Sequence, residues 1–475
     1  MPAGTPAPPG DLPDLVIRGA LAVGLAGTFT ADIGISGGRI VALADNLRGG
    51  RELDARGLVA LPGIIDPHVH LEDIGAGGTP TADDFASGTA SALAGGVTTI
   101  LDFASPAPGG DYLEAFATRR EQAARGSRVD FGLHCCLPAG GEDPSSAIAA
   151  LVREGVTSFK VFMVYAGLAQ DSFQLFRAMR AVAAQGAVLM AHAETGTIID
   201  GLVDEFLARG DTTPIYHAYS RPALCEEAAV VQALALHRGV GGRLYFVHIS
   251  TRAALERILF ERRAPGTQQR SGSEVFIETC PQYLLLSEDR LTGANGERFI
   301  CSPPLRPYGD REALWESVAA GAIDTIGTDH CPFTIADRSG KTSFAEVPNG
   351  LGGIGFGLPL MWTHGVAAGR MTPERLVALM SENPARIFGL WPKKGRIAPG
   401  ADADIVLVDP SARDRLSVQD LPGNEDYSVY EGIEATARVE YTVSRGEVVY
   451  DRRTGVTGEP GRGRYLARPV DASHT

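Results

Sequence analysis

The stretch that decides the fold is GIIDPHVH, residues 63–70, in which a short apolar run ends in two histidines. Residues 63–67 have the composition of a buried strand. Side chains two positions apart on a strand face the same way, so His68 and His70 would point together and could bind one divalent metal ion. The alternative is two histidines that satisfy hydrogen bonds of their own without any ligand.

Further apolar runs follow this stretch at regular intervals and alternate with Ala- and Leu-rich segments of helical character. The runs cover residues 98–103, 131–137, 158–164, 188–192, 244–249, 275–279 and 325–328, and the helical segments include 83–94, 113–125, 172–185, 221–237 and 251–262. Together with 63–67 this makes eight strands. Eight strands alternating with helices predict an α/β fold, a (β/α)8 TIM-like barrel.

Both ends of the chain have a different pattern, with short strand-like runs and tight turns. These runs cover residues 14–19, 30–34 and 39–44 before the barrel, and 404–409, 438–444 and 447–450 after it. We therefore expect one smaller β-sandwich domain, built from residues 14–63 and 395–455, beside a barrel over 64–394. Residues 1–13 would form a flexible tail and 456–475 a C-terminal tail.

The composition limits the class of protein. The chain has 475 residues, of which 44% are hydrophobic, and its formal net charge is -14. This excludes a disordered or fibrous chain and argues against nucleic acid or an anionic membrane as a partner. No apolar run approaches the roughly 18 residues of a membrane span. Six cysteines without a CxxC pair, and an N-terminus unlike a signal peptide, predict a cytoplasmic protein.

Polar residues recur where the apolar runs end. His192 closes one run, His248 lies in another and Asp329 follows a third. Catalytic groups of β/α barrels gather at these strand ends, so four histidines and an aspartate predict a binuclear metal site. Lys160 lies inside the apolar run 158–164, which suggests an amine whose charge is altered by a depressed pKa or by covalent chemistry. The alternative is an edge-strand lysine that reaches solvent.

Beyond these local patterns, the chain strongly resembles the cyclic amidohydrolases, in the dihydropyrimidinase/D-hydantoinase branch. The resemblance extends from about Asp14 to Arg468 and rests on motifs in a common order: GIIDPHVHLE, SFKVFMVYAG, MAHAE, YFVHIS, ETCPQYLLLS, GTDHCPF and NEDYSVYEG.

That resemblance implies two Zn²⁺ ions per subunit, bridged by Lys160 after its carboxylation by CO2 to N6-carboxylysine. The ligands of the first zinc would be His68, His70, Lys160 and Asp329, and those of the second Lys160, His192 and His248. It also implies a homotetramer, because residues 461–466 match a family segment that crosses to a neighbouring subunit.

The resemblance further implies the mechanism. A hydroxide that bridges the metals would attack a ring amide carbon of a small cyclic amide, and Asp329 would carry its proton to the leaving nitrogen. Tyr165 would donate a hydrogen bond to the oxyanion. Ser302 and Asn349 would hold the second amide edge of the ring through backbone groups.

Alternatives remain for the substrate. Dihydroorotases carry an Arg where this chain has Glu72, which would repel a substrate carboxylate. The segment 71–78 is acidic and Gly-rich, and it predicts a loose gate that favours a larger or more polar exocyclic group. An allantoinase or another cyclic imidase would use the same chemistry. A non-catalytic scaffold, such as the collapsin response mediator proteins, has lost metal ligands that this chain retains.

Overall fold

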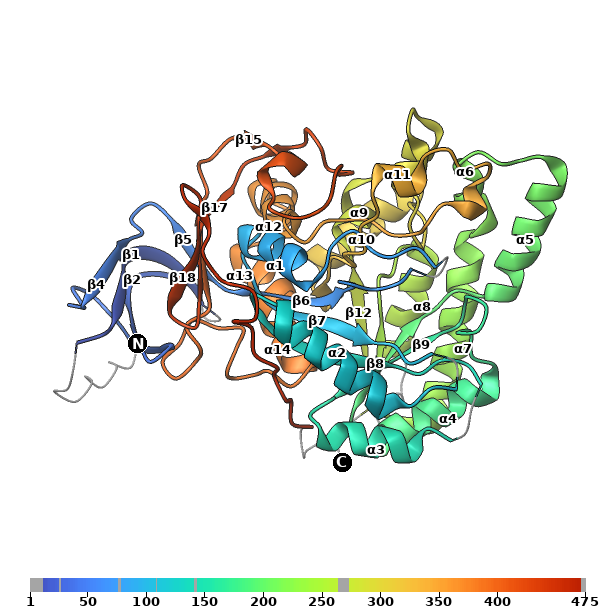
Figure 1. The fold of residues 1–475 in the computed structure, drawn as a ribbon, viewed down its shortest axis with the longest axis horizontal. Coiled ribbons are helices and arrows are strands. Elements are labelled where there is room, and N and C mark those ends of the chain that lie inside the picture. Colours follow the sequence, from blue (N-terminus) through green and yellow to red (C-terminus); the bar gives the residue numbers. More distant parts are fainter. Residues whose placement is uncertain are drawn as a thin grey trace.

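A computed structural model of the chain describes residues 12–24, 27–75, 78–107, 109–140, 143–263 and 273–470. Of the predicted flexible tail 1–13, all but Leu12 and Pro13 lie outside the described residues, as do residues 471–475 of the predicted C-terminal tail. The drawing shows a small sheet from both chain ends beside a larger helix-covered barrel (Figure 1).

The eight predicted strands pair side by side in one parallel sheet in the order of the chain, from β6 to β13. An isolated parallel bridge between Val69 and His330 joins the two edge strands, and the amide of His70 donates to the carbonyl of His330 at 2.8 Å. The (β/α)8 barrel is thereby confirmed. Its strands are β6 (Ile64–Val69), β7 (Val97–Ala104), β8 (Asp130–Cys136), β9 (Ser158–Phe162), β10 (Val188–His192), β11 (Arg243–Phe246), β12 (Glu274–Thr279) and β13 (Thr325–Ile326).

Helices cover the outside of this barrel, which explains why residues on both faces of its strands are apolar and buried. The predicted helical segments are present as α1 (Phe85–Ala94), α2 (Tyr112–Gly126), α4 (Ser172–Ala183), α7 (Ala223–Val240) and α8 (Arg252–Arg263). The structure adds α3 (Ser145–Arg153), α5 (Gly196–Arg209), α6 (Ile215–Ser220), α9 (Pro281–Leu285), α10 (Tyr308–Ala319), α11 (Ile335–Arg338), α12 (Gly357–Met361), α13 (Pro373–Val377) and α14 (Asn383–Ile387).

A second sheet combines both ends of the chain. Its central contact is the antiparallel pair β5–β14, in which Pro62 lies opposite Ile405. A hairpin joins β2 to β3 through Gly37 and Gly38, whose φ angles of 56° and 76° match a tight turn that glycine permits. The strands are β1 (Leu15–Gly24), β2 (Gly27–Ser36), β3 (Arg39–Ala44), β4 (Arg51–Asp54), β5 (Val59–Pro62), β14 (Ile405–Asp409), β17 (Arg438–Ser444), β18 (Glu447–Asp451) and β19 (Gly455–Val456).

The remaining strands, β15 (Asp414–Arg415) and β16 (Glu434–Ala435), form a separate antiparallel pair. The core of the second sheet contains residues from both ends, among them Ile17, Ile33, Ile405 and Val443, so the two ends bury one common apolar face. The domain boundaries after residues 63 and 394 stay a prediction. Among the described helices, none has the length and apolar character to cross a membrane.

Candidate metal centre and active site

Five of the six predicted metal ligands lie at or just beyond the carboxyl ends of barrel strands, and Lys160 lies in the middle of its strand. His68 lies in β6 and His70 just beyond it, Lys160 lies in β9, and His192 ends β10. His248 and Asp329 follow β11 and β13. These residues line one cavity of about 810 Å³, together with the predicted substrate contacts Tyr165, Ser302 and Asn349.

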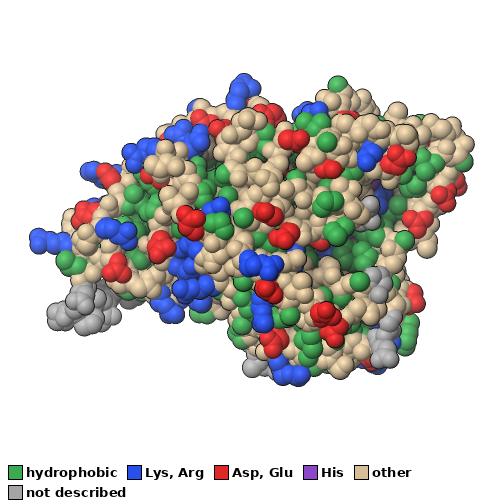
Figure 2. All heavy atoms as spheres, viewed as in Figure 1, with side chains coloured by type: hydrophobic (Ala, Val, Ile, Leu, Met, Phe, Trp, Pro, Cys, Tyr) green, Lys and Arg blue, Asp and Glu red, His purple; other side chains and the backbone are tan. Residues whose placement is uncertain are grey.

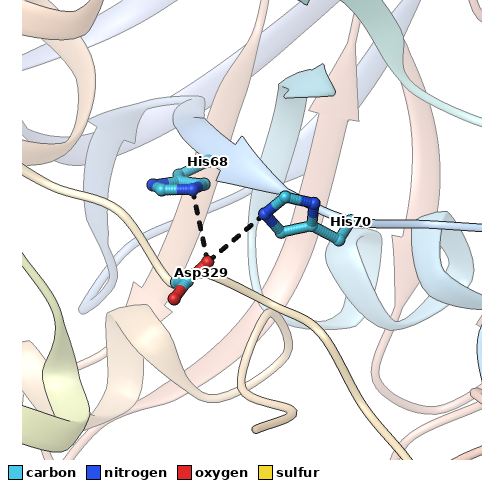
Figure 3. Close-up of side chains that lie close together, drawn as sticks. All are labelled: His68, His70 and Asp329. Atoms are coloured by element: carbon cyan, nitrogen blue, oxygen red, sulfur yellow. Dashed lines mark ion pairs between the residues drawn. The ribbon is translucent and has the colours of Figure 1, made fainter. Parts of the chain in front are cut away.

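His68, His70 and Asp329 form the tightest group in this cavity. The Nε2 atoms of His68 and His70 lie 3.3 and 3.5 Å from the same carboxylate oxygen, Oδ1 of Asp329. Figure 3 shows both rings turned toward this oxygen from neighbouring positions of the chain. One potential ligand atom from each residue lies within 4.8 Å of the other two, a spacing compatible with a single metal ion.

The remaining predicted ligands, His192, His248 and Lys160, lie in the same cavity. The rings of His192 and His248 are 4.5 Å apart, and that of His248 is 5.5 Å from the ring of His68. Lys160 is 1% exposed, and its Nζ lies 5.2 and 5.4 Å from the ring centres of Phe103 and Phe162. Burial lowers the pKa of Lys160 below its ordinary value. No carboxylate among the described residues lies within ion-pair distance of this amine.

The protonation states suit metal binding. Burial lowers the pKa of His68, His192 and His248, so these rings are neutral, the state in which imidazole binds a metal. Burial opposes protonation of His70 as well, but Asp329 and Asp73 raise its pKa to about 9. A metal ion would displace that proton, as metal binding generally does.

Two unpartnered nitrogens test whether a metal fits here. Nε2 of His68 and Nδ1 of His248 are buried and make no hydrogen bond within the part of the chain that the structure describes, although Nε2 of His68 lies 3.3 Å from Asp329. A buried polar atom without a partner costs free energy, so it calls for a ligand. Imidazole nitrogens, an aspartate and a lysine open to carboxylation are a donor set that suits zinc, and the residues present therefore fit it.

An outer layer of carboxylates orients the ligand rings. Oε1 of Glu278 lies 2.7 Å from Nδ1 of His68 and accepts from the amide of His248 at 3.0 Å. Glu194 lies 2.7 Å from Nε2 of His192, and Asp73 lies 3.0 Å from Nδ1 of His70. Such partners fix the tautomer and direction of a metal-binding imidazole.

The motifs and strand patterns predicted no role for Glu278, Glu194 or Asp73. The available signal was an acidic residue inside or just after an apolar run. Glu278 lies in 275–279, and Glu194 and Asp73 follow His192 and His70 by two and three positions. A buried carboxylate beside a strand-end histidine is the pattern that would have identified them.

Backbone strain is concentrated around the cavity. Glu72, Tyr165, His248 and Asp329 all line it, and their φ angles are 50°, 76°, 39° and 52°. The left-handed region is unfavourable for residues with a Cβ and persists where the surrounding structure imposes it, often at functional sites. The fold therefore holds two predicted ligands and the predicted oxyanion donor in strained conformations.

The rest of the cavity lining is mixed in character. Phe103, Phe162 and Leu168 give it an apolar surface, while Glu72 and Glu114 add carboxylates. Burial raises the pKa of Tyr165 to about 12, so its hydroxyl keeps the proton that it would donate. Of the predicted gate, residues 76 and 77 lie outside the described residues.

Comparison with known proteins places this geometry in a family. Residues 59–449 match the model of the Amidohydrolase family. A D-hydantoinase of Streptomyces coelicolor is 40% identical over 465 residues, which cover 95% of this chain and 97% of that protein. A D-phenylhydantoinase of Escherichia coli strain SE11 is 37% identical over 461 residues, covering 96% of this chain and 98% of that protein.

Solved structures agree with the sequence matches. Dihydropyrimidinase from Brevibacillus agri NCHU1002 is 36% identical and superposes with a TM-score of 0.92, covering 96% of this chain and 98% of that one. D-Hydantoinase from Bacillus sp. AR9 is 38% identical with a TM-score of 0.91, covering 96% and 99%. The chain belongs to the amidohydrolase family, in its branch of hydantoinases and dihydropyrimidinases.

Proposed function

We propose that this hydrolase opens a cyclic amide or imide ring of the dihydropyrimidine or hydantoin type with the help of two zinc ions. The observation that carries the proposal is the convergence of six metal-ligand candidates in one cavity, two of them with buried ring nitrogens that make no hydrogen bond among the described residues. The names of the similar proteins, D-hydantoinase and dihydropyrimidinase, support the same class of substrate.

His68, His70, Lys160 and Asp329 would hold one zinc ion, and Lys160 would share the other with His192 and His248. When bound, the pair of ions would acidify a water molecule and polarise the ring carbonyl. Lys160 would join both sites as its carbamate. Burial of its amine favours the neutral form, whose lone pair forms an N–C bond to CO2 with loss of one proton.

The protein's own groups would carry out the proton transfer and the positioning. The carboxylate of Asp329 would take up the proton of the attacking water and pass it to the ring nitrogen as the amide C–N bond breaks. The protonated hydroxyl of Tyr165 would donate to the developing oxyanion. Ser302 and Asn349 line the same cavity and would hold the second amide edge of the ring through their backbone groups.

A ring-opening assay on zinc-loaded protein with bicarbonate tests this proposal. The panel is dihydrouracil, hydantoin, a 5-substituted hydantoin, allantoin, dihydroorotate and a cyclic imide, with Lys160→Ala as the control. We expect turnover of dihydrouracil or a hydantoin that the control lacks. Activity confined to allantoin or the imide would favour the alternative, an allantoinase or other cyclic imidase. No turnover of any ring by protein that contains two zinc ions would refute the proposal.

The cellular setting is part of the same proposal: a cytoplasmic homotetramer that binds neither nucleic acid nor membranes. All six cysteines are free, which suits a reducing compartment. Figure 2 shows acidic and basic side chains interspersed on the face in view, unlike a nucleic-acid-binding surface. The tetramer rests on the family resemblance alone, because residues 461–466 pair with Ser127 and Phe131 of their own barrel in this structure and do not extend away from it. Sedimentation of the purified protein tests the tetramer.

A further inference from the structure

The end of the described chain lies along the base of the barrel, opposite the metal centre. We call residues 464–468 the strap. The amide of Phe131 donates to Arg464 at 3.0 Å, and the amide of Leu466 donates back to Phe131 at 2.8 Å, so the strap pairs with β8. The amide of Arg468 then donates to Gly155 at 3.0 Å, just before β9.

The barrel leaves space for this segment. A Cβ on Gly155 would lie 2.6 Å from the Cα of Ala467, and a Cβ on Gly389 would lie 2.8 Å from the carbonyl oxygen of Pro469. Both glycines have positive φ angles, 88° and 79°. Any other residue at either position would displace the strap or strain the backbone, so the close approach is built into the fold.

Arg468 extends from the strap into the barrel. It is 2% exposed, and its guanidinium donates to the carbonyl of Leu133 and, at 3.3 Å, to Oγ of Ser158. Burial lowers its pKa to about 10, and no carboxylate among the described residues lies within ion-pair distance. A buried cation with only neutral acceptors is costly, so its presence calls for an explanation beyond stability.

A directional chain of hydrogen bonds continues from this guanidinium. Oγ of Ser158 lies 2.5 Å from Nδ1 of His134, and Nε2 of His134 lies 2.9 Å from the carbonyl oxygen of Pro67. A carbonyl only accepts, so Nε2 carries the proton and Nδ1 accepts from Ser158. Ser158 is therefore left to accept from Nη1 of Arg468, while Nε of Arg468 has no hydrogen-bond partner among the described residues.

Both ends of this chain adjoin metal-ligand candidates. Pro67 directly precedes His68 on β6, and its carbonyl belongs to the peptide that carries His68. Ser158 lies two positions before Lys160 on β9, on the same side of the strand. These hydrogen bonds therefore connect β6, β8 and β9, and they do so below the ligand candidates of β6 and β9.

We propose that the strap is a positioning element for the metal centre, with Arg468, Ser158 and His134 as positioning residues. The inference rests on the proposed hydrolase function. None of the three lines the cavity, so they would act by fixing the direction of β6 and β9. A metal ligand that points in the wrong direction should lower kcat more than it weakens substrate binding, because the transition state tolerates smaller errors in geometry than the bound substrate does.

The test compares Arg468→Met, Arg468→Lys, Ser158→Ala and the double variant Arg468→Met/Ser158→Ala. Arg462→Met is the matched control, because Arg462 also lies in the C-terminal segment but donates to Ser444 and Glu447 of the second sheet and, at 3.4 Å, to the carbonyl of Arg128, and not to β9 or His134. With zinc content equalised, we expect kcat to fall at least about 10-fold in Arg468→Met and Ser158→Ala. KM should stay within about twofold, and the double variant should be no slower than the single ones.

The kcat of Arg468→Lys should lie between those of Arg468→Met and the wild type, and the kcat of Arg462→Met should equal that of the wild type. Hydrogen–deuterium exchange provides a readout that does not depend on activity. Peptides over 64–70 and 158–164 should exchange faster in Arg468→Met and in Ser158→Ala than in the control. Unchanged kcat and exchange in both variants, or additive losses in the double variant, would overturn the proposal.

If Arg468→Met does not fold, Ser158→Ala carries the same comparison. A wild-type protein that opens no ring would refute the proposed function, and the exchange data would still decide whether the strap positions β6 and β9.

Discussion

Lys160 is a buried amine among aromatic and imidazole rings, and no carboxylate among the described residues lies within ion-pair distance of it. An ordinary ammonium group would be poorly stabilised here, because burial penalises its charge and aromatic faces compensate only part of that cost. Conversion to a carbamate would replace the cation by an anion that two metal ions can share. The environment of Lys160 therefore favours its conversion to a carbamate over a purely structural role.

From this we predict that Lys160→Ala lowers kcat/KM more than about 100-fold, since even outer-layer changes at metal sites cost 10- to 100-fold. Bound zinc should fall from two ions to one or fewer, as measured by elemental analysis. Added short carboxylic acids should restore part of the activity by supplying the missing carboxylate. Full zinc content and normal turnover in the variant would contradict the assignment.

The charge of Glu72 should influence which substrates enter the cavity. Glu72 lies in the cavity wall, is exposed, and has no ion pair among the described residues. A carboxylate there disfavours a substrate that carries a negative charge, by a few kcal/mol at most near the surface.

We therefore predict that Glu72→Arg raises kcat/KM for dihydroorotate relative to dihydrouracil by about 10-fold or more, with a smaller effect at high salt. Glu121→Arg is the control, because Glu121 lies on α2 but is 71% exposed and pairs with Arg125 away from the cavity. An equal change in both variants would mean that net charge, and not the mouth of the cavity, determines the preference.

At the scale of elements, helix starts show how local sequence stabilises the barrel. Asp171 caps α4, where it accepts from the amides of Phe173 and Gln174 at 2.9 and 2.8 Å. The side chain of Gln174 accepts from the amide of Asp171 at 3.0 Å, which completes a capping box. The three capping hydrogen bonds are exposed at the surface, away from the cavity, so the cap should affect only the stability of the helix.

The prediction is that Asp171→Ala lowers the free energy of unfolding by about 1 kcal/mol in urea titrations and leaves kcat unchanged. Gln174→Ala removes only the reciprocal bond and should cost less. A loss in Gln174→Ala as large as that in Asp171→Ala would show that the cap does not act through the two helix amides.

At the scale of the whole molecule, one buried lysine ties the barrel to the second sheet. Nζ of Lys394 is 2.9 Å from Asp130 at the start of β8, and 2.5 and 3.3 Å from Asp404 and Asp402 beside β14. Burial opposes its charge, but the three carboxylates raise the pKa of Lys394 above its ordinary value. The three carboxylates are spaced closely enough to bind a metal ion, but the ammonium group of Lys394 already provides the positive charge between them.

We predict that Lys394→Met destabilises the folded chain by about 3–5 kcal/mol at pH 7, because it leaves three carboxylates without their shared cation. Burial alone would raise the pKa of Asp130, but Lys394 and Arg445 lower it below its ordinary value. A carboxyl with a lowered pKa stabilises the fold above about pH 4 and loses that contribution as the pH falls. The difference between wild type and variant in urea titrations should therefore shrink between about pH 5 and pH 3, and a constant difference would contradict this account.

The sequence alone determined the parts of this protein that depend on neighbouring residues. Apolar runs located the eight barrel strands, and the placement of His68, His70, His192, His248 and Asp329 at or near their ends predicted where ligand candidates meet. Helices such as α5, which begins at Gly196 without a side-chain cap, carry weaker local signals and were not singled out. Local patterns suffice for strands because burial on both faces leaves a run of apolar residues.

Only the tertiary structure decided which distant segments meet. The bridge from Val69 to His330 closes the barrel, β5 pairs with β14 across most of the chain, and Arg468 reaches Ser158 from 310 residues away. The outer carboxylate Glu278 likewise reaches His68 across 210 residues. The local sequence of each of these segments is compatible with packing against many other parts of the chain. Which partner it meets depends on which groups are buried together once the whole chain has folded.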